Sequence, residues 1–186
     1  YGGAARFLNI KAQLGAPTVL VDVIVVDGDR LSINVVNLGL EAHAAATMLR
    51  FRHSLLLGGR RAYYAGVLGA VSRHLKTRCR VIADGHEIFN GSLLTLSAAS
   101  GKYIGGGYLC APRAQNDDGL MEVCLVKPIK RLQLLRLLKQ YKMGRHLDSP
   151  DFEGRLIYTR AKSLRLECGD ETSLCMDGEI VTGKVF

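Results

Sequence analysis

The chain has 186 residues, of which 48% are hydrophobic, so it suits one domain with a sizeable core and not a disordered segment. Its net charge of +8 favours anionic partners such as phosphates or acidic lipid headgroups over nucleic acid, because Trp, a basic stripe with interleaved aromatics and a known nucleic-acid motif are all lacking. No apolar run approaches the roughly 20 residues of a membrane-spanning helix, and the first residues do not resemble a signal peptide.

The first half of the chain predicts a hairpin followed by helices. The expected elements are strand 19–26, turn 27–29, strand 31–36, helix 42–57 and helix 63–75. Asp27-Gly28 is a typical two-residue hairpin turn, and Gly58-Gly59 would end the first helix. A strand pair with helices packed against it is therefore expected at this end.

The second half predicts strands around one further helix. The expected elements are strands 80–83, 91–99 and 120–126, a helix from Pro128 to Tyr141, and two or three strands within 155–185. Strands dominate the whole chain, and neighbouring strands are joined by short turns. We therefore expect an α+β fold with a mainly antiparallel, sandwich-like sheet system and inserted helices.

The five cysteines are odd in number and form no C-x-x-C pair. Most lie within or beside apolar stretches, where a free cysteine behaves as a small buried hydrophobe. This usage predicts reduced thiols, no metal cluster and a cytosolic location.

Asp-Gly occurs at Asp27, Asp84, Asp118 and Asp177, and by itself this dipeptide indicates only a turn. Two of the four stand in richer contexts. Asp118 follows Asp117 in the segment 101–123, which also holds a cluster of glycines that would let the backbone approach another group closely. A double aspartate at a turn, with free backbone carbonyls, can gather the hard oxygen ligands that Mg²⁺ prefers.

The second context is L-C-M-D-G-E-I-V, residues 174–181. Glu179 follows the tight Asp177-Gly178 turn, so its carboxylate would project from a hairpin end. A carboxylate placed there can act as a general base, although an exposed hairpin glutamate without a chemical role fits the same spacing.

The order of these pieces resembles the C-terminal domain of the diacylglycerol, sphingosine and ceramide kinase family, including its bacterial lipid kinases. The resemblance covers nearly all of 1–186, taken as a single domain. The segments that carry it are V-D-V at Asp22, N-V-V-N-L-G-L-E-A at 34–42, G-R-R-A-Y-Y, G-G-G…A-P…D-D-G-L, G-R-H at 144–146 and D-G-E at 177–179. Residues 1–14 look like the connection from an N-terminal nucleotide-binding domain.

The resemblance implies transfer of the ATP γ-phosphoryl group to a primary hydroxyl of diacylglycerol, a sphingoid base or a related lipid. Glu179 would be the catalytic base, and Asp177 with Gly178 would support the nucleotide or the water shell of Mg²⁺. A structural Mg²⁺ would be held by the Asp118 carboxylate and by the backbone carbonyls of Gln115 and Leu120, with Asp117 reaching it through water. The implied cofactors are ATP and Mg²⁺.

The sequence departs from the family pattern in three ways. Glu41 stands where Asp is usual, and Ser100 stands where Asn generally precedes the glycine block. The phosphate-binding motif G-G-D-G-T is absent, so the chain alone is expected to be inactive until a nucleotide-binding domain completes it.

Basic residues gather around the two predicted central helices, at Arg50, Arg52, Arg60, Arg61, Arg73, Lys76, Arg78 and Arg80. They would suit peripheral association of a cytoplasmic enzyme with an anionic membrane, although a solvated helix face explains them equally well. A homodimer stays open, as do two other functions: a non-catalytic lipid-binding or regulatory module, and an NAD-kinase-like relative.

Overall fold

The computed structural model describes residues 8–51 and 76–186. The strands are β1 (Ile24–Val26), β2 (Arg30–Ser32), β3 (Val35–Gly39), β4 (Thr77–Ala83), β5 (His86–Leu93), β6 (Thr95–Ala99), β7 (Met121–Val126), β8 (Leu156–Ala161), β9 (Leu164–Met176) and β10 (Glu179–Val185). The helices are α2 (Ile10–Leu14), α3 (Leu40–Phe51) and α5 (Arg131–Lys142), with short 3₁₀ turns η1 (Gly105–Gly107), η2 (Arg145–Leu147) and η3 (Pro150–Phe152).

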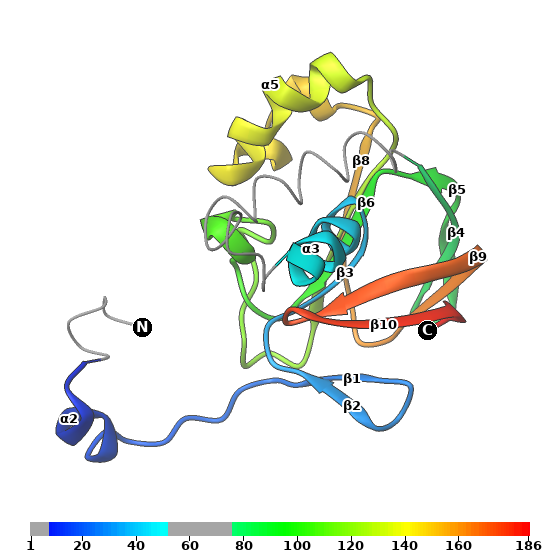
Figure 1. Ribbon diagram of the computed structural model, residues 1–186. Helices are drawn as coiled ribbons and strands as arrows, with labels where there is room; N and C mark the ends of the chain where they lie inside the picture. The colour runs from blue at the N-terminus through cyan, green and yellow to red at the C-terminus, as the bar shows by residue number, and fades with distance from the viewer. Residues whose placement is uncertain (1–7, 52–75) are drawn as a thin grey trace.

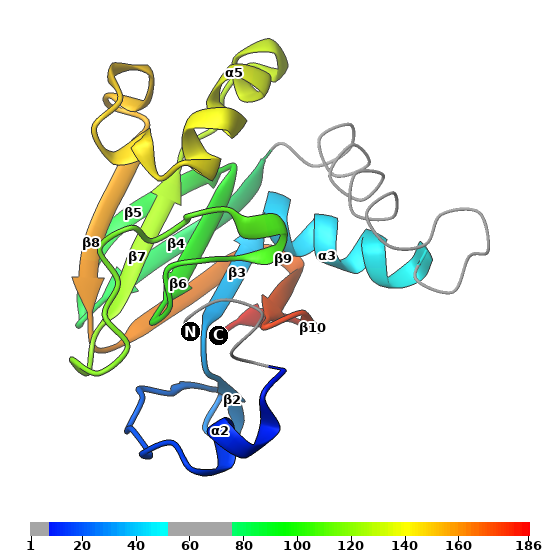
Figure 2. The same ribbon diagram turned by 90° about the vertical axis from the view of Figure 1, so that its left-hand side faces the viewer.

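Eight of the strands form one sheet in the order β5-β4-β9-β3-β6-β7-β8, with β10 paired to β9, and the registers between them are antiparallel. The long β9 joins two parts of this sheet, because its first half pairs with β4 and its last three residues pair with β3. Figure 2 shows β6, β7 and β8 side by side, with α5 beyond one end of them. The predicted class, a mainly antiparallel sheet system with a few helices, is confirmed.

Alternating side chains build the main core. Strand β4 buries every second residue, and Val81 pairs with Leu166 of β9 within the central apolar cluster. Strand β3, by contrast, buries all five of its residues, and Val35 and Asn37 on its second face line the cavity described below. None of the helices in the two described ranges is long and apolar enough to cross a membrane.

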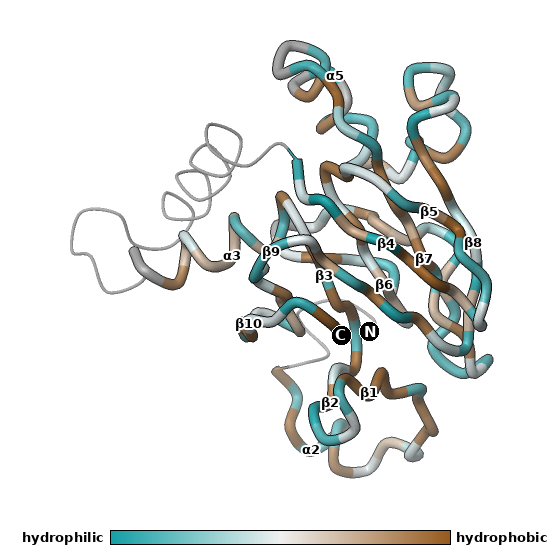
Figure 3. The backbone as a smooth tube through the Cα atoms, turned by 90° about the vertical axis from the view of Figure 1, so that its right-hand side faces the viewer, coloured by the Kyte–Doolittle hydropathy of each residue, from teal (hydrophilic) through white to brown (hydrophobic). Residues whose placement is uncertain are grey.

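The predicted hairpin at Asp27-Gly28 is confirmed, since both residues have positive φ and β1 pairs with β2 around them. Its first strand is shorter than the predicted 19–26, however. Residues 16–23 run extended without forming a ladder, and Leu20 is 94% exposed, although Figure 3 colours this stretch as hydrophobic. β2 has three residues, so it can pair only with the last three residues of the predicted strand.

Two further boundaries differ from the sequence prediction. Segment 91–99 forms the end of β5 and the separate strand β6, because Leu94 leaves the ladder: its N–H donates to Val126 and its carbonyl accepts from Leu40. Helix α3 begins at Leu40, two residues earlier than expected, directly after Gly39. Gly39 has φ of +86°, and a Cβ there would lie 2.5 Å from the Leu94 carbonyl oxygen, so the strand can turn into the helix here only with glycine. The predicted helix 63–75 lies outside the described residues.

Candidate functional site

The Asp177-Gly178 turn is fixed by a carboxylate clamp. Both residues have positive φ, as expected for a two-residue hairpin turn between β9 and β10. The Asp177 carboxylate accepts hydrogen bonds from Ser32 Oγ (3.0 Å), Ile33 N (2.7 Å) and Val35 N (2.9 Å). The Asp177 N–H in turn donates to the Val35 carbonyl at 3.1 Å. The carboxylate is therefore used to hold the start of β3 against the hairpin.

Glu179 is the first residue of β10 and pairs with Met176 across the hairpin. It is exposed, whereas Asp177 two residues earlier is tied down by its three donors. Both carboxylates of the D-G-E motif are thus exposed, and only that of Asp177 is held by the three donors. Glu179 is not among the residues that line the cavity described next, whereas Asp177 and Gly178 are.

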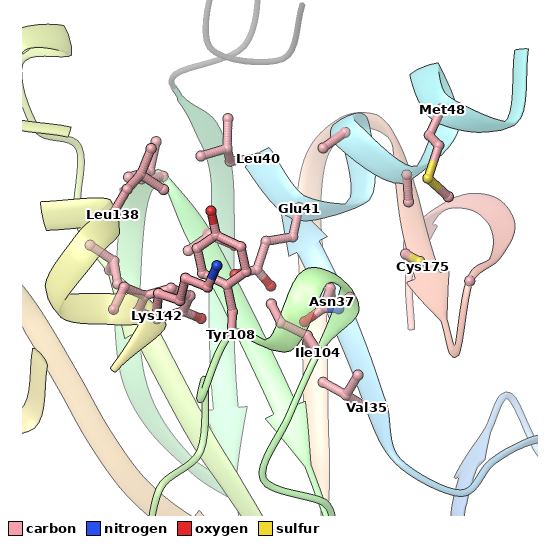
Figure 4. A pocket seen from close by; sticks show the side chains of 18 of the residues that line it. Val35, Asn37, Leu40, Glu41, Met48, Ile104, Tyr108, Leu138, Lys142 and Cys175 are labelled. Carbon is pink, nitrogen blue, oxygen red and sulfur yellow. The ribbon is translucent and has the colours of Figure 1, made fainter. Parts of the chain in front are cut away.

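An apolar cavity of about 740 Å³ ends at this turn, and Asp177 and Gly178 contribute to its wall. It lies between α3, α5 and the sheet, and Figure 4 shows side chains from all three projecting into it. Its apolar wall includes Leu40, Met48, Leu94, Ile104, Leu134 and Leu138. A cavity of this size and lining suits a small ligand with an apolar body.

The polar side chains of Asn37, Glu41 and Tyr141 interrupt this wall. Together with Ser97, the cross-strand partner of Asn37, they form a polar cluster. Ser97 Oγ donates to Glu41 Oε2 at 3.0 Å, and the Tyr141 hydroxyl also hydrogen-bonds the Glu41 carboxyl. Burial raises the pKa of Glu41 to about 7, partly offset by these two hydrogen bonds. Burial likewise raises the pKa of Tyr141 well above its usual value, so it stays a neutral donor.

His146, from the G-R-H segment, supports this cluster from behind. It is fully buried, its ring centroid lies 4.6 Å from that of Tyr141, and its Nε2 lies 3.2 Å from the Cys110 carbonyl oxygen. Burial lowers the pKa of His146 to about 4, so the ring is neutral at pH 7 and Nε2 donates to that carbonyl. The motif thus holds Tyr141 in place.

The glycine block packs against the same clamp. A Cβ on Gly101 would lie 2.0 Å from Asn34 Oδ1, so a larger residue there would require the Asn34 side chain to move. Asn34 Nδ2 donates to the Tyr103 carbonyl, and Ser100 Oγ donates to the Ile33 carbonyl at 3.2 Å. Ser100, where the family pattern has Asn, therefore still anchors the linker before β3.

The Asp118-Gly119 turn lies elsewhere and already has partners. Asp118 Oδ1 accepts from the Leu120 N–H at 3.0 Å, and Oδ2 pairs with the Arg160 guanidinium. Asp22 accepts from the Gly119 N–H at 2.8 Å, which ties V-D-V to this turn. No group of three or more His, Cys, Asp and Glu poised for a metal occurs within residues 8–51 and 76–186. A Mg²⁺ at Asp118 would fit the oxygen chemistry but would compete with Arg160.

The structure therefore separates the predicted residues into two places. Asp177, Gly178 and Glu179 share one hairpin at the cavity, whereas Gln115, Asp117, Asp118 and Leu120 share the other turn. Of the basic residues, Arg80 is paired with Glu87 and Glu167, and positions 52–73 lie outside the described residues. Asn37 was not among the predicted site residues, although an Asn within an otherwise apolar strand is a signal that could have marked it.

Comparisons with known proteins identify the family of the chain. Residues 34–185 match the family model described as YegS C-terminal NAD kinase beta sandwich-like domain. A diacylglycerol kinase of Mycobacterium tuberculosis (strain CDC 1551 / Oshkosh) is 30% identical over 123 residues, which are 66% of this chain and 37% of that protein. Human sphingosine kinase 2 is 36% identical over 95 residues, 49% of this chain and 14% of that protein.

The fold also matches solved structures. A crystal structure of a diacylglycerol kinase from Bacillus anthracis str. Sterne superposes with a TM-score of 0.58 at 19% identity, covering 89% of this chain and 48% of that chain. The chain thus spans less than half the length of these relatives. With 152 of its 186 residues matched, the chain belongs to the YegS C-terminal NAD kinase beta sandwich-like family of lipid kinases.

Proposed function

We propose that this chain forms the lipid-binding half of an ATP-dependent kinase that phosphorylates a primary hydroxyl of a lipid. The observation that supports this most strongly is the apolar cavity of about 740 Å³ that ends at the Asp177-Gly178 turn. A lipid chain buried in it would leave its polar end at the turn, beside Glu179. The names of the relatives, diacylglycerol kinase and sphingosine kinase, agree with a substrate of this kind.

In this proposal Glu179 orients the lipid hydroxyl and accepts its proton as the oxygen attacks. Phosphoryl transfer needs mainly positioning and charge neutralisation, and a single carboxylate is sufficient for the proton. Asp177 acts as a positioning residue, because its clamp fixes the turn from which Glu179 projects. ATP with Mg²⁺ would supply the transferred phosphoryl group and neutralise its charge.

A nucleotide-binding domain is the proposed partner that holds ATP, and the hairpin end with Asp177 and Gly178 would face its phosphates. A second, structural Mg²⁺ is proposed at Asp118, with the carbonyls of Gln115 and Leu120. Loading from an anionic membrane surface, at which a cytoplasmic enzyme would work peripherally, suits a water-insoluble substrate and a net charge of +8.

The test is a kinase assay on the chain joined to the nucleotide-binding domain of its own protein. With ATP and Mg²⁺ it should phosphorylate at least one of diacylglycerol, monoacylglycerol and sphingosine presented in vesicles. The 186-residue chain alone should bind lipid without phosphorylating it. Lipid binding without phosphorylation by the joined protein would instead support a regulatory lipid-binding module, and phosphorylation by the chain alone would refute the need for a partner.

A further inference from the structure

One polar atom in the cavity wall has no partner. Asn37 is 6% exposed, and its Oδ1 forms no hydrogen bond with any residue in the described part of the chain. A buried acceptor left unpaired costs about 1–3 kcal/mol, so its presence in a packed strand calls for a partner that arrives with the ligand. Asn37 lines the cavity, so that partner can reach it.

Glu41 provides a second acceptor next to it. Asn37 lies on β3 and Glu41 in the first turn of α3, and Figure 4 shows both side chains projecting into the same part of the cavity beside Ile104. Ser97, the cross-strand partner of Asn37, and Tyr141 hold the Glu41 carboxyl by hydrogen bonds. The Asn37 amide oxygen and the fixed Glu41 carboxyl therefore form a pair of acceptors within an otherwise apolar wall.

The position of Asn37 relative to the turn sets which part of a lipid it would meet. Val35 donates to Asp177, and Asn37 follows two residues later on the same face of β3, about 7 Å along the strand. A lipid whose reacting end lies at the turn would therefore meet Asn37 with a group about 7 Å or less from that end, which polar groups on neighbouring carbon atoms can span with hydrogen bonds of about 3 Å each.

We propose that Asn37 and Glu41 bind a hydrogen-bond donor, a hydroxyl or an amine, on the lipid carbon next to the reacting hydroxyl. This inference rests on the proposed lipid kinase function and adds a substrate preference to it. A monoacylglycerol or a sphingoid base carries such a donor. In a 1,2-diacylglycerol that carbon is esterified and offers acceptors only, which would leave Asn37 Oδ1 unpaired in the complex.

The test compares lipids that differ in this donor alone. Binding of 1-oleoylglycerol, its 2-O-methyl ether and sphingosine to the 186-residue chain is measured by calorimetry, with each lipid delivered from cyclodextrin. Wild type should bind 1-oleoylglycerol at least tenfold more tightly than its ether. Asn37→Leu should remove this preference while leaving the melting temperature unchanged or higher, because it replaces an unpaired buried amide by an apolar side chain of similar size.

Further variants separate the two donor chemistries. If an amine is the donor, Glu41→Gln should weaken the binding of sphingosine tenfold or more and the binding of 1-oleoylglycerol less. If a hydroxyl is the donor, Asn37→Leu should weaken lipid binding more than Glu41→Gln does. Leu138→Ala, which changes the apolar wall only, should weaken all three lipids alike. Equal wild-type affinity for 1-oleoylglycerol and its ether, with sphingosine unaffected by both variants, would overturn the proposal and leave lipid binding intact. Binding of none of the lipids would overturn the proposed function as well.

Discussion

Two Asp-Gly turns in this protein have nearly the same construction and different surroundings. Asp84 and Asp177 both have positive φ, and each carboxylate accepts three hydrogen bonds from a distant segment. Asp84 receives them from Lys162 and Ser163 at the start of β9, far from the cavity, whereas Asp177 forms part of the cavity wall. A clamped aspartate is thus a general way of fixing a hairpin here, and chemistry is expected only where such a hairpin borders the cavity.

The residue that follows each turn should give the largest difference between the two hairpins. Glu179→Gln in the joined, active protein should keep the fold and ATP binding but lower turnover by about 10² or more, the usual scale for removing a general base. The equivalent residue after the other turn is His86, and His86→Gln should leave turnover unchanged. Steady-state kinetics measures both, and a Glu179→Gln enzyme within a few-fold of wild type would show that the two hairpins are equally inert.

The clamps themselves should differ in strength. Asp177→Ala removes three hydrogen bonds to a carboxylate and leaves the N–H of the buried Val35 unpaired, so we expect a loss of about 2–3 kcal/mol in the free energy of unfolding. Asp84→Ala should cost less, because its partners are exposed and water can replace the carboxylate. Urea unfolding of both variants tests this order. A larger loss for Asp84→Ala would mean that the hairpin away from the cavity carries more of the stability.

The pKa of the Glu41 carboxyl is shifted in the direction opposite to that of Asp84. Hydrogen bonds from Ser163 lower the pKa of Asp84, whereas burial raises the pKa of Glu41 from 4.5 to about 7. Between these two pH values the unfolded chain releases the Glu41 proton and the folded chain keeps it, so stability should fall as pH rises from 4.5 to 7. The effect should be on the order of 3 kcal/mol.

Glu41→Gln should remove this pH-dependent part. Urea unfolding at pH 4.5 and pH 8 measures it as the difference between wild type and variant, which cancels the contributions of other titrating groups. An identical pH dependence in the two proteins would place Glu41 in a solvated environment instead of the cavity wall.

Substitutions at the Asp118-Gly119 turn should have the smallest effect, a change in how Mg²⁺ shifts the melting temperature. If Mg²⁺ binds there, millimolar Mg²⁺ without ATP should raise the melting temperature of wild type by a few degrees. Asp118→Ala should abolish this shift, and Arg160→Gln should enlarge it, because the guanidinium competes for the same oxygen. Equal Mg²⁺ sensitivity in wild type and Asp118→Ala would show that this turn is structural only.

The sequence allowed the turns to be predicted better than the strand ends. Three of the four Asp-Gly pairs, at Asp27, Asp84 and Asp177, have positive φ at both residues and form the hairpin turns that this dipeptide predicts, whereas at the fourth only Gly119 has positive φ. The end of β5 at Leu93 could not be predicted, because it depends on Leu94 donating to Val126, a partner 32 residues later. Similarly, nothing local in segment 19–26 shows that β2 is too short to pair with its first five residues.

The cavity could not be predicted from local sequence patterns. D-G-E and D-D-G could be identified as motifs, and the structure assigns them to separate places. The pairing of Asn37 with Glu41 depends on the transition from β3 to α3 at Gly39, where a strand face continues into a helix face. The alternation of the strand and the 3.6-residue repeat of the helix, each taken alone, do not show that Asn37 and Glu41 line the same cavity.

The Asp177 clamp also bears on when the site can appear during synthesis. Asp177 bonds to Ile33, 144 positions earlier in the chain, so closing this contact requires ordering a very long loop. Contacts of such high sequence separation form slowly compared with local hairpins and helices. A ribosome-bound chain could pair β4 with β5 and β3 with β6, but these two parts of the sheet stay separate, and the cavity mouth stays incomplete, until β9 emerges. Release of the last hairpin, β9–β10, would be the event that completes the site.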